Sequence, residues 1–320
     1  MSFTTAMVTG ASGFIGAALT DHLRRKGKRV LAAGRPSSLL PRADMHVRVA
    51  WPTPEELRPL LEDEQVDVLY HCAAYGVAPD QRDMKTMFDA NVRAAGAWVE
   101  VAAAFEMPAF VYVGSCSEYG SPCEEIPIDE DRPLDAVELY GASKAAGGQW
   151  ARAVAQHLGV GFQWLRLFGV VGPGEPVHRL LPYLHNRLRA GHRVDLTPGQ
   201  QWRDFLHIDD AVAGLSLAGE AARNGQFGTF NLCSGKGVKL RLVAEAVARA
   251  MGVSADLLDF GGRPYRADEP MWMVGDCSRF EALTDFRASI GIEDAVSRTI
   301  SALDSRAERR NYERPNAGSS

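Results

Sequence analysis

The chain has 320 residues, 46% of them hydrophobic and 23% charged, which is the composition of a globular protein with a large buried core. Its formal net charge of -5 gives no general attraction to nucleic acid or to acidic membranes, so neither is an expected partner. No apolar run reaches the ~18 residues of a membrane-spanning helix, no signal peptide is evident, and the five scattered cysteines contain no C-x-x-C pair typical of zinc. We therefore expect a cytoplasmic protein without a metal centre.

Short apolar segments, often β-branched, alternate with longer amphipathic segments along the first half of the chain. Strand–helix alternation of this kind is typical of a parallel sheet covered by helices on both faces. The expected fold class is therefore α/β, a Rossmann-type doubly wound parallel sheet. The expected strands are Ala6–Val8, Arg29–Ala33, His46–Val49, Val66–His71, Phe110–Val113 and Gly161–Leu165, and the expected helices are Ile15–Lys26, Met84–Phe105 and Ser143–Leu158.

The pattern changes after Phe168. Residues 169–199 are rich in Pro, Gly, His and Arg and predict loops around one helix, Leu181–Ala190. A strand at Thr229–Cys233 and a helix at Leu240–Met251 are expected to follow. These differences predict a smaller C-terminal substrate domain beside the Rossmann domain.

The expected domain bounds follow from the same change of pattern. The Rossmann domain is predicted to span residues 1–168, and residues 205–235 are predicted to return to it. The substrate domain is predicted to consist of residues 169–204 and 236–303. The polar and charged composition after Asp304 predicts a frayed tail at residues 304–320.

A glycine-rich segment, Gly10-Ala11-Ser12-Gly13-Phe14-Ile15-Gly16, joins the first expected strand to the first expected helix. Glycines permit a tight turn and let backbone N–H groups approach a pyrophosphate, to which the helix N-terminus adds partial positive charge. Such a string often marks an ordinary turn, but at the first strand–helix junction of a βαβ pattern it predicts a dinucleotide site. The residues expected to contact the dinucleotide are Gly10, Gly13, Phe14, Ile15 and Gly16.

The residues after the second expected strand indicate which dinucleotide binds. An acidic residue there would hold the ribose 2′-hydroxyl of NAD, whereas an arginine accommodates the 2′-phosphate of NADP. This chain has Arg35, with Ser37 and Ser38 close behind, and no carboxylate until Asp44. The alternative is a solvated arginine in a surface turn. Arg35 and Ser37 therefore favour NADP(H), with NAD as the alternative cofactor.

A tyrosine and a lysine four residues apart, Tyr140 and Lys144, lie on one face of an expected helix. Ser115 ends an apolar strand upstream, at the carboxyl edge where ligands bind in parallel sheets. A tyrosine hydroxyl titrates near ~10, and lowering its pKa to about 7 needs roughly 4 kcal/mol. An ammonium ~4 Å away supplies about that much at an effective dielectric near ~20. The three residues predict a catalytic group in which Lys144 activates Tyr140 and Ser115 orients the reacting oxygen.

Together these features resemble the extended short-chain dehydrogenase/reductase family, which comprises sugar-nucleotide epimerases, dehydratases and reductases. The resemblance covers nearly the whole chain. It implies that Ala73 and Asn91, with Tyr140 and Lys144, contact the dinucleotide, and that Ser115 and Ser117 contact the substrate. It also implies a homodimer formed through two helices of each subunit. The matching segments are Val8–Gly16, Asp67–Ala74, Asn91-Val92, Ser115–Gly120 and Arg166–Phe168 before Gly172-Pro173, and the two helices are Met84–Phe105 and Tyr140–His157.

The same resemblance implies three arginines that bind the diphosphate of a nucleotide-diphosphate sugar. Arg203 precedes Asp204-Phe205 in a block similar to the family's R-D-[FY] motif. Arg266 lies ten residues before Asp276, where relatives carry an arginine, and Arg179 matches a position near the same phosphates. A guanidinium binds two oxygens at once, which suits a diphosphate. For any one of the three, a surface salt bridge is the alternative.

The residues after Ser115 restrict the reaction. Dehydratases of the family carry an Asp-Glu pair directly after the catalytic residue, where this chain has Cys116 and Ser117. Decarboxylating relatives carry a glutamate at the second of these positions. Here Glu118 lies one residue further, on a strand face that is expected to point away unless a bulge turns it. Dehydration is therefore disfavoured and decarboxylation is not expected.

The remaining reactions share the Ser/Tyr/Lys chemistry. Arg35 favours a reductase that exchanges NADPH in each turnover, and Gly114 and Gly169 depart from the typical epimerase pattern. The chain resembles nucleotide-diphosphate 4-keto-6-deoxysugar reductases, and we expect that activity. An NAD-dependent nucleotide-sugar 4-epimerase is the alternative. A catalytically inactive dinucleotide-binding regulator is disfavoured because Ser115, Tyr140 and Lys144 are all present.

Overall fold

The computed structural model describes residues 2–122 and 124–312. A seven-stranded sheet lies at its centre, in the order β10-β6-β5-β4-β1-β2-β3, and every neighbouring pair is parallel. This order is that of a doubly wound dinucleotide-binding sheet, so the predicted fold class is confirmed. The strands are β1 (Thr5–Thr9), β2 (Arg29–Gly34), β3 (Met45–Arg48), β4 (Val68–His71), β5 (Ala109–Ser115), β6 (Gly161–Leu167) and β10 (Gly228–Leu232).

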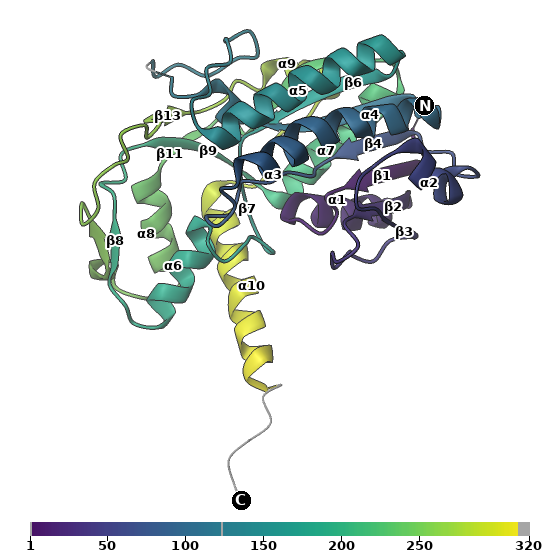
Figure 1. Ribbon diagram of the computed structural model, residues 1–320. Helices are drawn as coiled ribbons and strands as arrows, with labels where there is room; N and C mark the ends of the chain where they lie inside the picture. The colour runs from purple at the N-terminus through teal and green to yellow at the C-terminus, as the bar shows by residue number, and fades with distance from the viewer. Residues whose placement is uncertain (1, 123, 313–320) are drawn as a thin grey trace, which may run out of the picture.

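Helices cover both faces of this sheet (Figure 1). Successive strand residues point to opposite faces, so that Val8 packs in one core and its neighbour Met7 in the other. Both faces are apolar, which explains why strands such as β5 are buried along their whole length. One face carries α1 (Phe14–Arg25), α7 (Ile208–Arg223) and α9 (Ser278–Thr284). The other carries α2 (Pro54–Leu61), α5 (Leu139–Leu158) and the continuous segment α3 (Met84–Phe88), η1 (Asp89–Arg93) and α4 (Ala94–Ala104), in which η1 is a π-helical turn.

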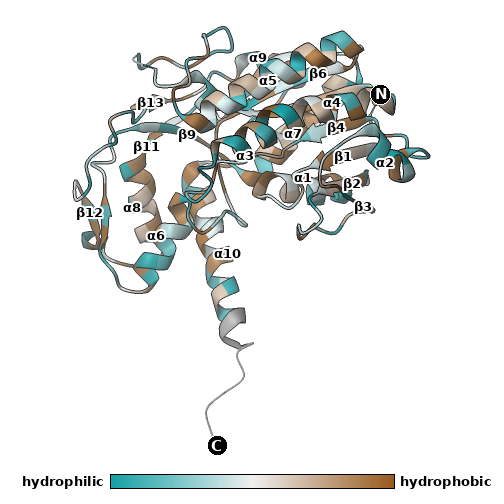
Figure 2. Ribbon diagram, viewed as in Figure 1, coloured by the Kyte–Doolittle hydropathy of each residue, from teal (hydrophilic) through white to brown (hydrophobic). Residues whose placement is uncertain are grey.

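A second group of elements has its own hydrophobic core. Its helices show apolar and polar residues on different sides (Figure 2), as expected when only one side is buried. The group contains two strands, β7 and β8, inside the region 169–199 that was predicted to hold only loops around a helix. Each is three residues long, too short to give a periodic pattern. The elements are α6 (Leu180–Arg189), α8 (Leu240–Ala250), α10 (Ile292–Tyr312), β7 (Gly169–Val171), β8 (Val194–Leu196), β9 (Trp202–His207), β11 (Gly237–Lys239), β12 (Leu258–Phe260), β13 (Trp272–Met273) and the short turn η3 (Ala255–Leu257). A second short turn, η2 (Cys116–Tyr119), follows β5 of the large sheet.

The C-terminal helix α10 was not among the predicted elements, and it enters the segment that was expected to fray. Fraying was expected from Asp304, but the helix continues to Tyr312 and extends away from the body in Figure 1. Asp304 explains part of the difference, because its carboxylate pairs with His185 Nε2 at 2.9 Å and Arg189 Nη1 at 2.7 Å, both on α6. Residues 313–320 of the predicted tail lie outside the described residues. The domain bounds given above remain a proposal.

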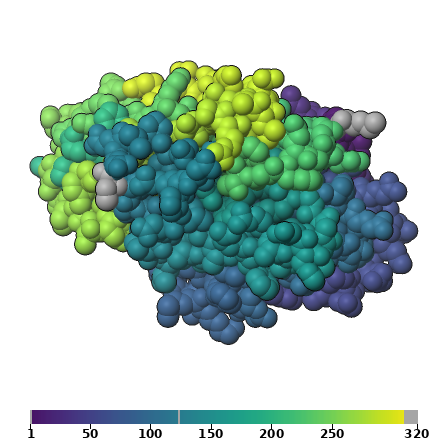
Figure 3. All heavy atoms as spheres, turned by 90° about the horizontal axis from the view of Figure 1, so that it is seen from above, coloured from purple at the N-terminus to yellow at the C-terminus, as the bar shows by residue number. Residues whose placement is uncertain are grey.

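The segment between η2 and α5 contacts β13 and the residue that follows it. Ile128 N–H donates to Val274 C=O at 2.9 Å, and Trp272 Nε1 donates to Ile126 C=O at 2.6 Å. In the space-filling view of Figure 3 this blue-teal segment lies against yellow-green C-terminal residues. The two groups of elements are therefore joined beside the carboxyl edge of the large sheet.

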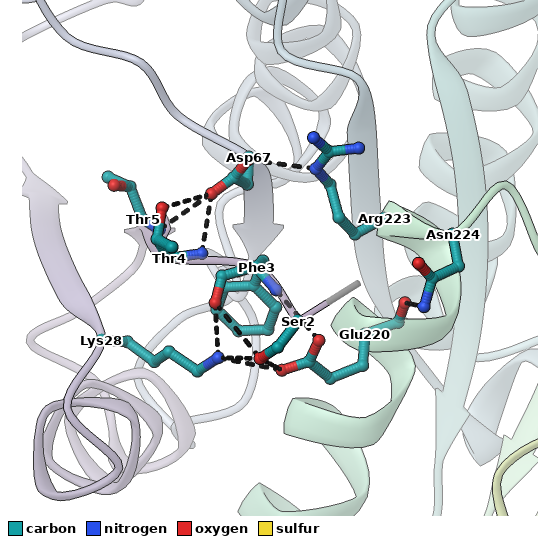
Figure 4. Close-up of polar contacts among 9 residues, drawn as sticks. All are labelled: Ser2, Phe3, Thr4, Thr5, Lys28, Asp67, Glu220, Arg223 and Asn224. Atoms are coloured by element: carbon teal, nitrogen blue, oxygen red, sulfur yellow. Dashed lines mark hydrogen bonds and ion pairs between the residues drawn. The ribbon is translucent and has the colours of Figure 1, made fainter.

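The amino edge of the sheet is closed by side chains (Figure 4). The Asp67 carboxylate accepts hydrogen bonds from Thr4 N–H at 2.8 Å, Thr5 N–H at 3.0 Å and Arg223 Nε at 3.0 Å. Burial alone would raise the pKa of Asp67, but these bonds outweigh it and the pKa is lowered. Glu220 of α7 accepts from Ser2, Phe3 and Lys28 in the same way. These contacts fix the N-terminus of the chain against β4 and α7 at the amino edge of the sheet.

Within the described part of the chain, no helix combines the length and the apolar character needed to cross a membrane.

Candidate active site

The carboxyl ends of three strands meet at one point of the sheet. Thr9 at the end of β1 pairs with His71 of β4, which in turn pairs with Tyr112 of β5. The chain leaves β1 toward β2 on one side and β4 toward β5 on the other, so the strand order reverses here. Ligands of doubly wound sheets bind at such a switch point.

The glycine loop after β1 packs backbone against backbone. Gly10 has a φ of +63°, and a Cβ there would lie 2.6 Å from the Cα of Ala73. A Cβ on Gly16 would lie 2.3 Å from the Gly10 carbonyl oxygen, so both positions require glycine. The helix α1 begins at Phe14, and no described side chain caps its N-terminus. This cradle fits a dinucleotide pyrophosphate, which the exposed backbone at Gly13 and the free N–H groups of the first turn would hold.

The turn after β2 leaves one arginine exposed and uses another to hold its shape. The Arg48 guanidinium donates to the carbonyl oxygens of Pro36 at 2.8 Å and Ser38 at 2.9 Å. Arg35 and Ser37 are exposed on this turn. The first carboxylate after β2, Asp44, accepts from Val30 N–H at 2.9 Å. The structure thus places Arg35 and Ser37 at the tip of β2, with Asp44 committed elsewhere.

Ser115, Tyr140 and Lys144 are brought together. Ser115 is the last residue of β5, and Tyr140 and Lys144 lie in the first two turns of α5. A Cβ on Gly141 would lie 2.3 Å from the Ser117 carbonyl oxygen, so glycine allows α5 to begin directly against the turn that follows Ser115. The Tyr140 hydroxyl is hydrogen-bonded to the Ser115 side chain. Lys144 is 1% exposed.

The pKa values of Tyr140 and Lys144 differ from those expected if the lysine lowers the pKa of the tyrosine. Burial raises the pKa of Tyr140 to about 12; Glu118 and Cys116 add to the rise, and Arg179 and the Ser115 hydrogen bond oppose it. Burial also lowers the pKa of Lys144 to about 8. The Lys144 Nζ lies 4.2 Å from the centre of the Tyr112 ring. Burial of the phenol therefore works against the predicted lowering of the Tyr140 pKa.

The turn after Ser115 explains where the next side chains point. Ser115 Oγ accepts from Ser117 N–H at 3.2 Å, and Glu118 Oε1 accepts from Ser115 N–H at 2.8 Å. This reciprocal pair is a capping box on η2. Glu118 is therefore on a helical turn and not on a strand as predicted, yet it does point away from the crevice. Its carboxylate is 0% exposed and lies 3.3 Å from Arg166 Nε.

Two of the three predicted diphosphate arginines share one carboxylate. Arg203 Nη2 lies 2.6 Å from Glu269 Oε1, and Arg266 Nε lies 3.1 Å from Glu269 Oε2. Arg179 has a separate partner, with its Nε 3.2 Å from Glu175 Oε1. Its charge still lowers the pKa of Tyr140, which places it near the catalytic group. Neither glutamate was predicted as a partner, although Glu175 precedes Arg179 by four residues and Glu269 follows Arg266 by three.

Asn91 does not present a free group to a ligand. It is 0% exposed, its Oδ1 accepts from Tyr75 N–H at 2.8 Å, and its Nδ2 donates to Tyr75 C=O and Ser143 Oγ, both at 2.8 Å. The side chain of Asn91 thus has a structural role, and its predicted contact with the dinucleotide stays a prediction. Asn91 joins the loop after β4 to α5, which carries Tyr140. Ala73, in contrast, is partly exposed beside Gly10.

Comparison with known proteins agrees with this geometry. The sequence model of the NAD dependent epimerase/dehydratase family matches residues 6–233. The chain is 28% identical over 280 residues to dTDP-6-deoxy-L-talose 4-dehydrogenase (NAD(P)(+)) of Kitasatospora kifunensis, covering 84% of this chain and 86% of that protein. It is 26% identical over 309 residues to a UDP-glucose 4-epimerase of Mycolicibacterium smegmatis, covering 92% and 96%.

A solved structure shows the same fold. The UDP-glucose 4-epimerase of Thermotoga maritima superposes with a TM-score of 0.84 at 19% identity, covering 95% of this chain and all of that one. The family match runs from β1 to the end of β10 and so includes the glycine loop, Ser115, Tyr140 and Lys144. The chain belongs to the NAD dependent epimerase/dehydratase family.

Proposed function

We propose that the protein reduces the 4-keto group of a nucleotide-diphosphate 4-keto-6-deoxysugar with NADPH. The observation that carries the proposal is the turn after β2, where Arg35 is exposed and the next carboxylate, Asp44, is bonded to Val30 N–H. An arginine there suits the 2′-phosphate of NADPH, the cofactor that a reductase exchanges in each turnover. The 4-epimerase alternative would use the same Ser115, Tyr140 and Lys144 but would retain its NAD.

Tyr140, Ser115 and Lys144 have different roles in the proposed reaction. Tyr140 donates its proton to the sugar oxygen, and Ser115 holds that oxygen by a hydrogen bond. Lys144, buried behind them, stabilises the phenolate left on Tyr140. When bound, NADPH supplies the hydride. The glycine loop would hold its pyrophosphate, and Arg35 with Ser37 would hold its 2′-phosphate.

The residues after Ser115 do not supply the acid and base groups that dehydration or decarboxylation would need. Burial raises the pKa of the Cys116 thiol to about 12, so it stays neutral and is a poor base. Ser117 has no acidic proton to give, and the Glu118 carboxylate points into the sheet. These features disfavour dehydration and decarboxylation and leave the simple transfer of one hydride and one proton.

The substrate class rests on Arg203 and Arg266. Two guanidinium groups already held around one carboxylate are spaced to bind neighbouring phosphate oxygens. The curated relative from Kitasatospora kifunensis is a dTDP-6-deoxysugar 4-dehydrogenase by name, which supports a 6-deoxysugar oxidised or reduced at C4.

A stoichiometric assay tests the function. A panel of UDP-, dTDP-, CDP- and GDP-linked 4-keto-6-deoxysugars is offered with NADPH, and one reduced nicotinamide should disappear for each sugar reduced. The purified protein should carry little dinucleotide, because a reductase releases its cofactor in each turnover. A nucleotide-sugar 4-epimerase, which the M. smegmatis relative favours, would retain NAD. The reductase would be wrong, and the epimerase right, if the purified protein held NAD tightly and interconverted two 4-hydroxy epimers without added cofactor.

The cofactor preference is tested at the turn after β2. Arg35→Asp is expected to weaken NADPH binding about 10- to 150-fold, since a charge-assisted contact of ~1.5–3 kcal/mol is lost, and to change NADH binding little. Dissociation constants from fluorescence titration at fixed salt measure both. Arg25→Asp makes the same charge change on the exposed end of α1 and should leave both constants unchanged. Equal losses for NADPH and NADH in Arg35→Asp would show that Arg35 does not read the 2′-phosphate.

The proposed homodimer uses an apolar groove of about 700 Å³ between η1, α4 and α5. Phe88 and Trp150 line it and are each 53% exposed, although both are large hydrophobic residues. Trp150→Glu is expected to convert a dimer to a monomer in sedimentation equilibrium. Leu242→Glu, on the exposed side of α8, should leave the mass unchanged. A monomeric wild-type protein would refute the dimer.

A further inference from the structure

One aromatic side chain lies directly against the catalytic lysine. Tyr112 is three residues before Ser115 on β5, is 0% exposed, and packs in the core between the large sheet and α5. Lys144 is in the second turn of α5 and is 1% exposed. Removing an ammonium from water is costly unless neighbouring groups replace part of its hydration. The groups around Lys144 therefore affect whether it carries its charge.

Tyr112 contacts both ends of Lys144. Its hydroxyl donates to the Lys144 backbone C=O at 3.0 Å, and the Lys144 Nζ lies over its ring, 4.2 Å from the ring centre. A cation at this distance over an aromatic face is attracted by the electrons of the ring, most strongly where water is excluded. Gly147 allows the close approach, because a Cβ there would lie 2.9 Å from the Tyr112 hydroxyl oxygen. One side chain thus holds both the α5 backbone and the ammonium.

Neighbouring rings fix the orientation of Tyr112. The rings of His71 and Tyr112 stack with their centroids 5.9 Å apart and an interplanar angle of 20°, and Trp164 meets Tyr112 edge to face at 5.8 Å and 89°. His71 is held in turn by a hydrogen bond between its Nδ1 and Thr9 Oγ1 at 2.9 Å. Burial raises the pKa of Tyr112 and lowers that of His71 to about 3, so neither ring is charged near neutral pH. Tyr112 is therefore a fixed, neutral ring whose face meets the ammonium.

Titratable groups of the neighbouring elements also act on Lys144. Burial lowers its pKa to about 8, and Glu118 and Cys72 oppose that change. Glu118 is itself paired with Arg166 at 3.3 Å, and burial raises the pKa of the Cys72 thiol to about 12, so that thiol is neutral. Tyr112 is the group that the geometry places directly against the ammonium. The titratable groups that face Lys144 are His71 at the end of β4, Cys72 directly after it, Tyr112 on β5, Glu118 on η2 and Tyr140 on α5.

We propose that Tyr112 is a positioning residue for the catalytic lysine, whose backbone it fixes through its hydroxyl and whose ammonium it stabilises through its ring face. The inference rests on the proposed role of Lys144, which is to stabilise the phenolate of Tyr140. Because Tyr112 is 0% exposed, it reaches neither substrate nor cofactor and acts through Lys144. A Tyr112 with a purely structural role would fill the core, but its ring electrons would not affect the ionisation of Lys144.

Fluorinated rings at position 112 test the contact without changing its shape. Fluorine draws electrons away from the ring face, so the attraction for a cation falls with each fluorine while the ring keeps nearly the same size. The series consists of Tyr112→Phe and of mono-, di- and trifluorinated phenylalanine at the same position. The measurement is the titration of Lys144 by carbon-13 NMR of lysine-labelled protein without cofactor, with Lys144→Met to assign the signal. The spectrum is simple because the chain has only Lys26, Lys28, Lys85, Lys144, Lys236 and Lys239.

We expect the Lys144 midpoint in Tyr112→Phe to stay close to the wild-type value, because the ring is kept. It should fall with each added fluorine, by about one pH unit for the trifluorinated ring, a ~10-fold change in the acid dissociation constant. Tyr112→Phe should fold, because Lys144 lies inside α5 and its carbonyl oxygen keeps its helical hydrogen bond.

Phe162 is the matched control. Its ring stacks on that of Tyr112 with the centroids 6.3 Å apart, so it belongs to the same aromatic group. Trifluorinated phenylalanine at position 162 should leave the Lys144 midpoint unchanged. The proposal is overturned by a midpoint that does not depend on the number of fluorines at position 112, or by an equal shift from position 162.

Turnover tests the hydroxyl of Tyr112. In an active enzyme, Tyr112→Phe should lower kcat about 3- to 10-fold with KM for the nucleotide sugar nearly unchanged, because a hydrogen bond that places Lys144 is lost. An unchanged kcat in this variant would reject the role of the hydroxyl.

The reductase and the role of Tyr112 can fail separately. The lysine titration needs no substrate, so a midpoint that follows fluorination supports Tyr112 even if no 4-keto sugar is reduced. A midpoint that ignores fluorination, together with stoichiometric consumption of NADPH, rejects Tyr112 and leaves the reductase standing.

Discussion

Tyr140→Phe is expected to lower kcat at least about 100-fold while leaving the fold and the affinity for NADPH nearly unchanged, since a positioned general acid contributes about 10²- to 10⁴-fold. The substitution removes one hydroxyl and keeps the ring, which lies against Gly76. Ser115 loses a hydrogen-bond partner but keeps its bond from Ser117 N–H at 3.2 Å. The measurements are kcat in the NADPH assay, the melting temperature and the NADPH dissociation constant.

Tyr183→Phe is the matched control, because Tyr183 lies on α6 and is 37% exposed. It should keep full activity. A Tyr140→Phe enzyme that retained more than about a tenth of the wild-type kcat would have lost under ~1.4 kcal/mol of transition-state stabilisation. Such a small loss would mean that another group donates the proton.

Arg203→Ala is expected to raise KM for the nucleotide sugar about 10- to 150-fold, because a charge-assisted contact of ~1.5–3 kcal/mol to the diphosphate is lost. Its side chain is 18% exposed, so the guanidinium is partly desolvated and its contacts are screened little by salt. Glu269 would keep Arg266 as a partner, which limits the damage to the fold. KM, the inhibition constant of the free nucleoside diphosphate and the NADPH dissociation constant are measured together.

Arg266→Ala should also raise KM for the nucleotide sugar. Arg263→Ala removes an exposed arginine three residues earlier on the same segment and should leave KM unchanged. NADPH binding should be normal in all three variants. Unchanged inhibition by the nucleoside diphosphate in both Arg203→Ala and Arg266→Ala would contradict a diphosphate site at these residues.

The sequence alone predicted those features that local patterns encode. The strands of the large sheet are buried on both faces, so they appear as apolar runs, and the glycine loop stands at a strand–helix junction. Tyr140 and Lys144 are one helical turn apart, and Ser115 ends a strand, so their meeting at one edge followed from topology. The position of Arg35 was also predictable, because its turn directly follows a strand.

Other features depend on contacts between distant segments and on burial. Glu269 meets Arg203 across 66 positions of the chain, and no periodicity marks that pair. The high pKa of Tyr140 reflects burial by surrounding elements, which the Tyr140/Lys144 spacing does not report. Glu118 points into the sheet because the chain enters a 3-10 turn after Ser115, whereas strand alternation was expected to continue. The hydrogen bonds of the Asn91 amide to Tyr75 and Ser143 also join distant segments and have no local pattern.

The position of Glu269 between two guanidinium groups has a consequence for the proposed diphosphate site. Arg203 and Arg266 already hold one anion, so a diphosphate bound there would replace the Glu269 carboxylate and release it to water. The local charge would then change by less than the charge of the incoming ligand, and a single small anion would gain little over the carboxylate it replaces. At the proposed site Glu269 would therefore act as an internal competitor that favours ligands carrying more than one phosphate.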